Sequence, residues 1–291
     1  MKRNGGLRAA AIAAFLTSSA LGSAQAAVVT FSWSPAAVGL TTGPATDILN
    51  ANNYNIADFA ASTINTTTGA FTETGYLNIL SFLNGGNPVS ALGLGGGIPA
   101  LSISGYSLYL AFSGTGTTAA LPTVTGTTSN GVFSSLEYTL IGTPNAPLSF
   151  TVSGGTTSVT PATGLVLGYG SLVPGTGFLS TTKTANGYSP TANANLSFHQ
   201  CTAALGGPCV ADESAFFLAP LAGLDLQVGN FSATDTVTSL TASGPETQFL
   251  DINGGGGNLT FITSTPEPAS VAVLGAGLIG LAGIIRSRRK S

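Results

Sequence analysis

Apolar and polar residues alternate one by one along several segments of this chain. In the clearest segment the alternating pairs of residues are Tyr106 and Ser107, Leu108 and Tyr109, Leu110 and Ala111, and Phe112 and Ser113. The same period of two recurs at residues 148–153, 224–229 and 259–261. Successive side chains of a β-strand point to opposite faces of its sheet, so this period predicts antiparallel strands with one buried face.

The pattern between these segments is also typical of an all-β protein. No long segment has the 3.6-residue period of an amphipathic helix, and only Ile56–Ala61 resembles a helical turn or two. Glycine, proline and asparagine predict turns at 114–118, 144–147 and 254–257. We therefore expect an antiparallel β-sandwich of the jelly-roll kind, from which the pattern does not separate a barrel.

The number of β domains stays open at this point. About 240 residues between the two ends suffice for one large domain or two smaller ones. The low-complexity stretch 114–131 is predicted to be a loop, with an interdomain linker as the alternative.

Charged residues are scarce between the two ends. Residues 27–265 contain one basic residue, Lys183, and ten acids, which gives a formal charge of −9. Such a chain cannot neutralise phosphates, so nucleic-acid binding is excluded as a function. Its polar surface must come from threonine, serine, asparagine and glycine, a composition that indicates a secreted or cell-surface protein.

The first 26 residues have the layout of a secretory signal peptide. Met1-Lys2-Arg3 forms a basic region together with Arg8, Leu7–Leu21 is mostly apolar, and Ser23–Ala26 supplies a small-residue cleavage site. We expect a signal helix over residues 1–26 that the Sec export machinery reads and that is cleaved after Ala26.

The C-terminal end combines three features in a fixed order. The tripeptide Pro266-Glu267-Pro268 precedes the apolar stretch Val271–Ile285, and a basic cluster follows, made of Arg286, Arg288, Arg289 and Lys290. This stretch predicts a transmembrane helix, and the positive-inside rule places the basic cluster on the cytoplasmic face. Fifteen residues are short for a full span, and Ala269 with Ser270 can extend it.

This order resembles the PEP-CTERM sorting signal of exported bacterial surface proteins. The resemblance implies that an exosortase, a membrane enzyme, processes the chain near Pro266, Glu267 and Pro268 after transient anchoring in the inner membrane. The chain would then divide into a signal peptide (1–26), a β-rich extracytoplasmic domain (27–264) and a sorting signal (265–291).

Segments of the predicted β domain are similar to flocculation-associated PEP-CTERM proteins. They are residues 71–79, 105–112 and 168–172. The resemblance implies a surface or matrix protein of a Gram-negative bacterium, needed for cell aggregation together with exopolysaccharide. It supplies no catalytic residues.

A glycine motif in the apolar stretch does not predict a cofactor. Residues 275–280 fit G-x-G-x-x-G, but that motif binds dinucleotides only between a strand and a helix, with an acid about 20 residues further on. Eleven residues follow Gly280 in this sequence, so we expect no nucleotide site and no cofactor.

Two cysteines and one histidine lie close together in the sequence. Cys201 and Cys209 enclose a Gly-Gly-Pro turn, and an even pair in an exported protein predicts a disulfide. His199 is the sole histidine, so a zinc site is not expected, and we interpret it as a surface or packed imidazole. Trp33, the sole tryptophan, is expected to pack in the core.

The acids do not assemble a recognisable catalytic or metal motif. No serine lies in a G-x-S-x-G elbow, and no calcium-loop spacing is present. The side chains whose oxygens could bind calcium are Asp212 with Glu213, Asp225, Asp235, and Asp251 with Asn253. Solvated surface acids are the simpler interpretation, so no catalytic or metal residue is predicted.

Two functions from different classes remain. The first is a non-enzymatic structural or adhesive protein of the cell surface or extracellular matrix. The second is a secreted carbohydrate-active enzyme or calcium-dependent lectin that carries the same sorting signal.

Overall fold

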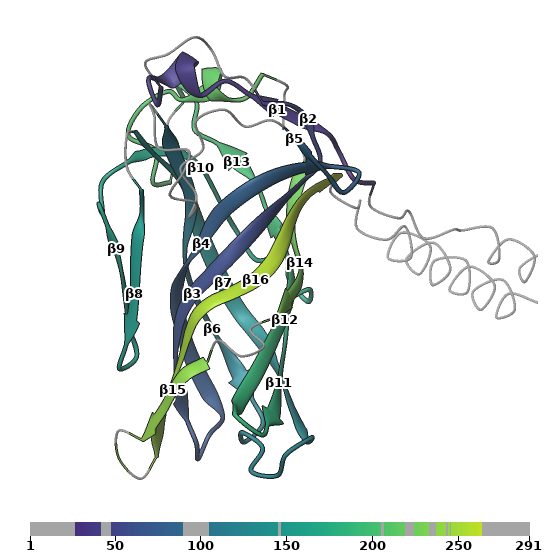
Figure 1. The fold of residues 1–291 in the computed structure, drawn as a ribbon, viewed down its shortest axis with the longest axis vertical. Helices are drawn as coiled ribbons and strands as arrows, with labels where there is room; N and C mark the ends of the chain where they lie inside the picture. Colours follow the sequence, from purple (N-terminus) through teal and green to yellow (C-terminus); the bar gives the residue numbers. More distant parts are fainter. Residues whose placement is uncertain are drawn as a thin grey trace, which may run out of the picture. The chain divides into compact units, whose positions relative to one another are not determined.

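Antiparallel strands make up nearly all of the regular structure in the computed structural model (Figure 1). It describes residues 27–41, 48–89, 105–144, 147–204, 207–218, 224–232, 237–242, 244 and 246–263. Val28–Thr263 forms one compact unit. The predicted signal peptide with Ala26, the sorting motif and the basic cluster all lie outside the described residues.

Eight long strands form a ring in which each strand pairs with the next along the chain. They are β3 (Asn53–Asn65), β4 (Ala70–Asn84), β6 (Tyr106–Thr118), β7 (Thr128–Pro144), β11 (Phe178–Thr184), β12 (Gly187–Ser197), β14 (Leu224–Ser232) and β16 (Thr247–Thr263). Pairing of β16 with β3, from Thr247 opposite Asn65 to Leu259 opposite Tyr54, joins the last strand to the first. The result is one antiparallel sheet closed on itself.

The all-β, antiparallel prediction is therefore confirmed, while a closed sheet replaces the expected division into two facing sheets. Its physical reason is the connectivity. Neighbours in the ring follow chain order, so each hairpin extends the same sheet. A jelly-roll needs Greek-key connections that cross between two sheets.

Three segments that were predicted as turns or a helix belong to strands. Residues 56–61 lie in β3, 114–118 in β6 and 254–257 in β16. The low-complexity stretch 114–131 is thus the end of β6, a connection and the start of β7, and no interdomain linker.

Glycines within these strands make room for aromatic rings inside the sheet. A Cβ atom at Gly116 would lie 2.5 Å from the Phe71 ring, and one at Gly75 would lie 2.7 Å from the Phe112 ring. Alternation of small and large residues is how a small closed sheet fills its interior. Glycine therefore serves packing at both positions, and Gly116 lies in a strand where the sequence predicts a turn at 114–118.

The remaining strands branch from the ring or stand beside it. They are β1 (Phe31–Trp33), β2 (Ile48–Ala51), β5 (Asn87–Val89), β8 (Ser149–Ser153), β9 (Thr156–Thr160), β10 (Leu165–Ser171), β13 (His199–Gln200) and β15 (Val237–Ala242). Two short 3-10 helices are η1 (Pro35–Val38) and η2 (Ser214–Phe216).

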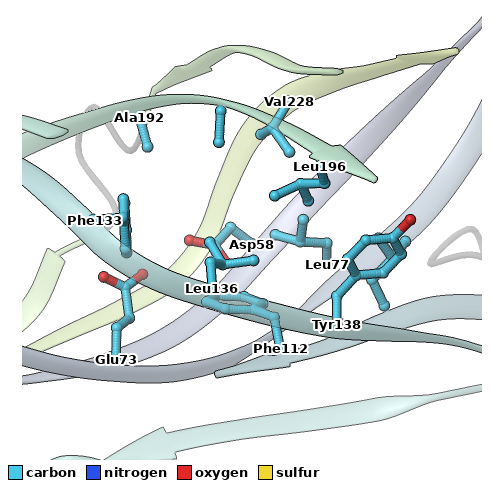
Figure 2. Close-up of a pocket in the computed structure, with 12 residues that line it drawn as sticks. Asp58, Glu73, Leu77, Phe112, Phe133, Leu136, Tyr138, Ala192, Leu196 and Val228 are labelled. Atoms are coloured by element: carbon cyan, nitrogen blue, oxygen red, sulfur yellow. The ribbon is translucent and has the colours of Figure 1, made fainter. Parts of the chain in front are cut away.

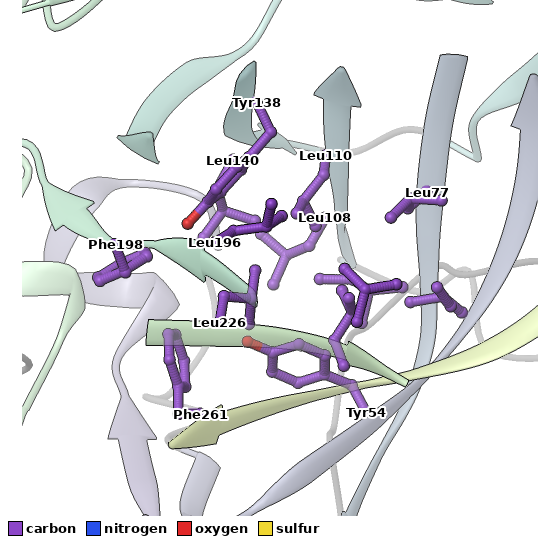
Figure 3. Packing of buried hydrophobic residues seen from close by; sticks show 14 of the residues in the cluster. Tyr54, Leu77, Leu108, Leu110, Tyr138, Leu140, Leu196, Phe198, Leu226 and Phe261 are labelled. Carbon is purple, nitrogen blue, oxygen red and sulfur yellow. The ribbon is translucent and has the colours of Figure 1, made fainter. Parts of the chain in front are cut away.

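Buried apolar side chains from all around the ring form a continuous core (Figure 3). Aromatic residues dominate one part of it, where Trp33 on β1 contacts the rings of Tyr54, Phe82 and Phe216. Backbone bonds tie β1 to the η2 segment, with the Ser34 N–H donating to Phe216 O (2.8 Å) and the Leu218 N–H to Ser32 O (2.9 Å). The expectation that Trp33 packs in the core is confirmed, since its side chain has no exposed area.

The predicted disulfide between Cys201 and Cys209 is present in the structure, with the two Cα atoms 5.5 Å apart. Cys201 is fully buried. Its N–H donates to Leu167 O and its carbonyl accepts the Glu213 N–H, so the bridge fixes the segment that leads into η2.

We expect this bridge to be oxidised in the mature protein and to contribute about 2–3 kcal/mol to stability, as a closed loop of this length predicts. Non-reducing peptide mapping checks the pairing, and urea unfolding of a Cys201→Ser, Cys209→Ser double variant checks the magnitude. Two free thiols in the mature protein, or a bridge between two chains, would contradict the prediction.

Candidate functional site

Two carboxylates lie inside the closed sheet. Asp58 on β3 is 2% exposed and Glu73 on β4 is 8% exposed. Both line a cavity of about 50 Å³ together with mainly apolar side chains (Figure 2). These are Leu77, Leu110, Phe112, Phe133, Leu136, Tyr138, Ala192, Ala194, Leu196 and Val228.

The period of the strands dictates this position. Asp58 follows the inward residues Tyr54 and Ile56 at the next alternate position, and Glu73 follows the inward Phe71 in the same way. Side chains two apart on a strand share a face. The two acids therefore point into the core with their apolar neighbours.

The carboxylates have few partners inside the sheet. The Ser62 hydroxyl donates to Glu73 Oε2 at 3.0 Å, while Asp58 Oδ1 has no hydrogen-bond partner among the described residues. No ion pair neutralises either acid within the described ranges. Lys183, the single cation between residues 27 and 265, lies over the Tyr188 ring, 4.4 Å from its centroid.

Burial shifts both acids toward the protonated form. Loss of hydration raises the pKa of Glu73 to about 6, against an ordinary 4.5, although the Ser62 hydrogen bond lowers it. Burial, and then the nearby Glu73 carboxylate, raises the pKa of Asp58 well above its ordinary value. The pair therefore holds protons within the core over a pH range in which solvated acids have lost them.

The size of the cavity limits what the pair can do. Sites for small molecules generally measure about 300–1,000 Å³, whereas this cavity of about 50 Å³ has room for a few water molecules. Protonated carboxyls are also poor ligands for cations. Among the described residues no cluster of three or more His, Cys, Asp or Glu side chains could hold a metal ion.

A larger groove lies on the outer surface beside β7. This strand pairs with β11 through residues 128–132 and with β10 through 137–142, so its two partners diverge between these segments. The groove of about 350 Å³ is lined by Ser134, Ser135, Glu137 and Ser171, with Phe133, Leu136, Leu172, Pro174 and Gly175. Hydroxyls and one carboxylate at this position can exchange hydrogen bonds with a hydroxyl-rich ligand.

A third feature is the β8–β9 hairpin, which lies against the outside of the sheet. The Phe150 ring stacks on Phe59 of β3, with centroids 4.5 Å apart. At its tip the N–H groups of Gly154 and Gly155 donate to the two oxygens of Asp251 at 2.9 and 3.0 Å. Asp251 thus anchors the hairpin, a role that the sequence did not reveal.

The other acids named as possible calcium ligands form no metal-binding group of three or more among the described residues. Asp212 is exposed and accepts the Ser214 N–H at 3.0 Å, and hydrogen bonds from Ser214 lower its pKa. Asp225 lies on β14, and burial raises its pKa. Asp235 lies outside the described residues.

His199 has the simple role that its position in the sequence suggested. It is exposed on β13, and its ring packs against Tyr169 with centroids 5.3 Å apart.

Searches of known proteins supply no family assignment: no family model, no curated protein and no solved structure matches the chain. No helix in the described part of the chain is long and apolar enough to cross a membrane.

Proposed function

We propose that this is an exported, exosortase-processed protein of the cell surface or extracellular matrix, with a structural and adhesive role in floc or biofilm formation together with exopolysaccharide. It is transiently anchored in the inner membrane of a Gram-negative bacterium and is not an enzyme. The observation that carries the proposal is the C-terminal order of Pro266-Glu267-Pro268, apolar stretch and basic cluster.

Features of the described domain support the same conclusion. Its strands expose mainly serine and threonine, as on β9, where Thr156, Ser158 and Thr160 all face solvent. The interior cavity is small for a sugar, and the outer groove contributes a single carboxylate, Glu137, to its lining. Glycoside hydrolysis commonly uses a pair of carboxylates.

We expect replacement of Pro266, Glu267 and Pro268 by alanine to leave the protein as an unprocessed membrane form, because the rigid prolines present Glu267 in an extended segment for recognition. Intact-mass analysis of the protein from cells measures processing. Cells that carry this variant should disperse while the yield and length of the secreted polysaccharide stay unchanged.

Replacement of the adjacent Ser264 and Thr265 by alanine is the matched control and should leave processing intact. Normal removal of the C-terminal segment from the triple variant would refute the sorting interpretation. Altered polysaccharide length or composition in dispersed cells would instead favour an enzyme.

The outer groove favours a second candidate, a carbohydrate-binding or carbohydrate-active protein with the same sorting signal. Its volume of about 350 Å³ falls in the range of ligand sites, and three serines line it. The single carboxylate favours binding over cleavage.

A further inference from the structure

The β8–β9 hairpin forms a two-stranded sheet of its own. In Figure 1 it stands beside the closed sheet, and its two strands run past β3 and β4. Gly154 and Gly155 connect the strands in left-handed conformations, with φ of 57° and 79°. This is the two-residue turn that holds a tight hairpin with a fixed register.

One face of the hairpin is attached and the other is free. Phe150 and Val152 on β8 and Val159 on β9 lie on the face that packs on the closed sheet. Val159 is 8% exposed. The free face consists of six exposed hydroxyl residues in three directly facing pairs: Ser149 with Thr160, Thr151 with Ser158, and Ser153 with Thr156. Neither strand contains a charged residue or a proline.

Both outer edges of the hairpin carry main-chain groups without a strand partner in the described part of the chain. The pair that flanks a two-residue turn exchanges hydrogen bonds, and bonded pairs then alternate along the strands. The N–H and C=O groups of Phe150 and Val152 on β8 therefore point away from β9. Those of Thr157 and Val159 on β9 point away from β8.

Proteins usually protect such edges by charge, by proline, or by shortness. β5, another branch strand, has three residues and contains Pro88, and β13 has two residues. Each strand of the hairpin has five residues, Ser-Phe-Thr-Val-Ser in β8 and Thr-Thr-Ser-Val-Thr in β9, and neither contains a charge or a proline. The contrast identifies the hairpin edges as a surface suited to strand addition.

We propose that the free edges of the β8–β9 hairpin bind the same edges of a second copy of this chain by antiparallel strand addition. β8 is complementary to itself: pairing centred on Thr151 places Phe150 of each copy opposite Val152 of the other, on the apolar side. The hydroxyls remain on the opposite side. Two edges per copy allow assembly to continue beyond a dimer.

The charge distribution favours the hairpin over the rest of the surface for the approach of a second copy. The segment 27–265 has a formal charge of −9, so two copies repel each other over most of their surfaces. The hairpin lacks charge altogether, and the nearby Asp251 carboxylate is already engaged by the turn N–H groups. Physiological salt screens the repulsion between charges that lie more than about 8 Å apart. Approach of two copies through this uncharged edge therefore has the smallest electrostatic cost.

This inference names the partner for the adhesive role and rests on the proposed function only for its biological meaning. The test uses the mature protein purified from culture, with light scattering coupled to size exclusion over a range of concentrations. The wild-type mass should rise with concentration and should be unaffected by a metal chelator.

A Val152→Pro, Thr157→Pro double variant removes the outward N–H groups and keeps the bonds within the hairpin. We expect it to associate roughly tenfold or more weakly, because each pairing loses two main-chain hydrogen bonds. The matched control, Val152→Ala with Thr157→Ala, shortens the same side chains, retains the N–H groups and should assemble like the wild type. Circular dichroism verifies that both variants are folded.

A wild-type protein that stays monomeric at all concentrations overturns the inference, as does equal association of the proline and alanine variants. Association that requires added polysaccharide or another protein also overturns it. If the strand-addition test fails but the variant with alanine at residues 266–268 (the tail variant) still disperses cells, the proposed function stands. Conversely, normal processing of the tail variant removes the proposed function while strand addition in the purified protein stands.

Discussion

We expect the free energy of unfolding to fall by about 2 kcal/mol between about pH 3 and pH 7.5 because of Glu73 alone, with most of the fall between pH 4.5 and pH 6. Its pKa is about 6 in the folded protein and 4.5 in a solvated chain, and each unit of difference corresponds to about 1.4 kcal/mol. Asp58, whose pKa burial also raises, adds a fall of the same sign that starts near the ordinary Asp range.

The sign follows from proton binding. Between the two pKa values the folded protein keeps the proton on Glu73 while the unfolded chain has released it, so raising the pH favours the unfolded chain. Stability from this residue is complete below pH 4.5 and is lost as the pH passes through 6. Most proteins stabilised by paired carboxylates show the opposite trend in this range.

Urea unfolding at a series of pH values measures this effect. Glu73→Gln should remove about 2 kcal/mol of the fall, and Asp58→Asn should remove a further part, since each amide keeps the shape of the acid without its ionisation. Glu246→Gln removes the same charge from an exposed residue and serves as the control. Equal pH slopes for wild type and Glu73→Gln would show that Glu73 ionises as freely in the fold as in the unfolded chain.

Strand identity was predictable from the sequence wherever one face is apolar and the other polar. The alternation around Leu108, Leu226 and Phe261 corresponds to β6, β14 and β16. Closure of the sheet was not predictable, because it depends on which edges meet across long sequence distances, as β16 and β3 do. The period of two specifies which face of a strand is buried, but it does not specify which other strand lies beside it.

The two buried acids, Asp58 and Glu73, are not singled out by the sequence, and Asp58 lies in the stretch 56–61 that resembles a helical turn. Asp58 and Glu73 occupy alternate positions in line with inward residues, but an acid at such a position is usually taken as solvent-facing because lone buried charges are costly. Protonation removes the charge and so lowers that cost. Asp251 was hidden for another reason: its partners are backbone N–H groups of Gly154 and Gly155, about a hundred residues away, and no side-chain pattern records them.

Trp33→Ala should destabilise the protein by roughly 3–5 kcal/mol, the range for deleting a large buried aromatic side chain. The centroid of the Trp33 ring lies 4.8 Å from that of Phe82 and 5.1 Å from that of Phe216. The Trp33 ring also stacks on Tyr54, with an angle of 12° between the ring planes. It therefore joins β1 and η2 to the core of the closed sheet. A cavity there would loosen both segments, because the β1–η2 backbone bonds depend on the same packing.

Trp33→Phe is the matched variant. It keeps an aromatic ring and loses an indole N–H that has no partner among the described residues, so we expect less than half the cost of the alanine variant. Urea unfolding followed by circular dichroism compares the three proteins, since Trp33 is the sole tryptophan and its variants lose that fluorescence signal. Faster proteolysis near residues 28–41 in Trp33→Ala should accompany the loss. A cost below about 1 kcal/mol for alanine would mean that β1 contributes little to closing this part of the core.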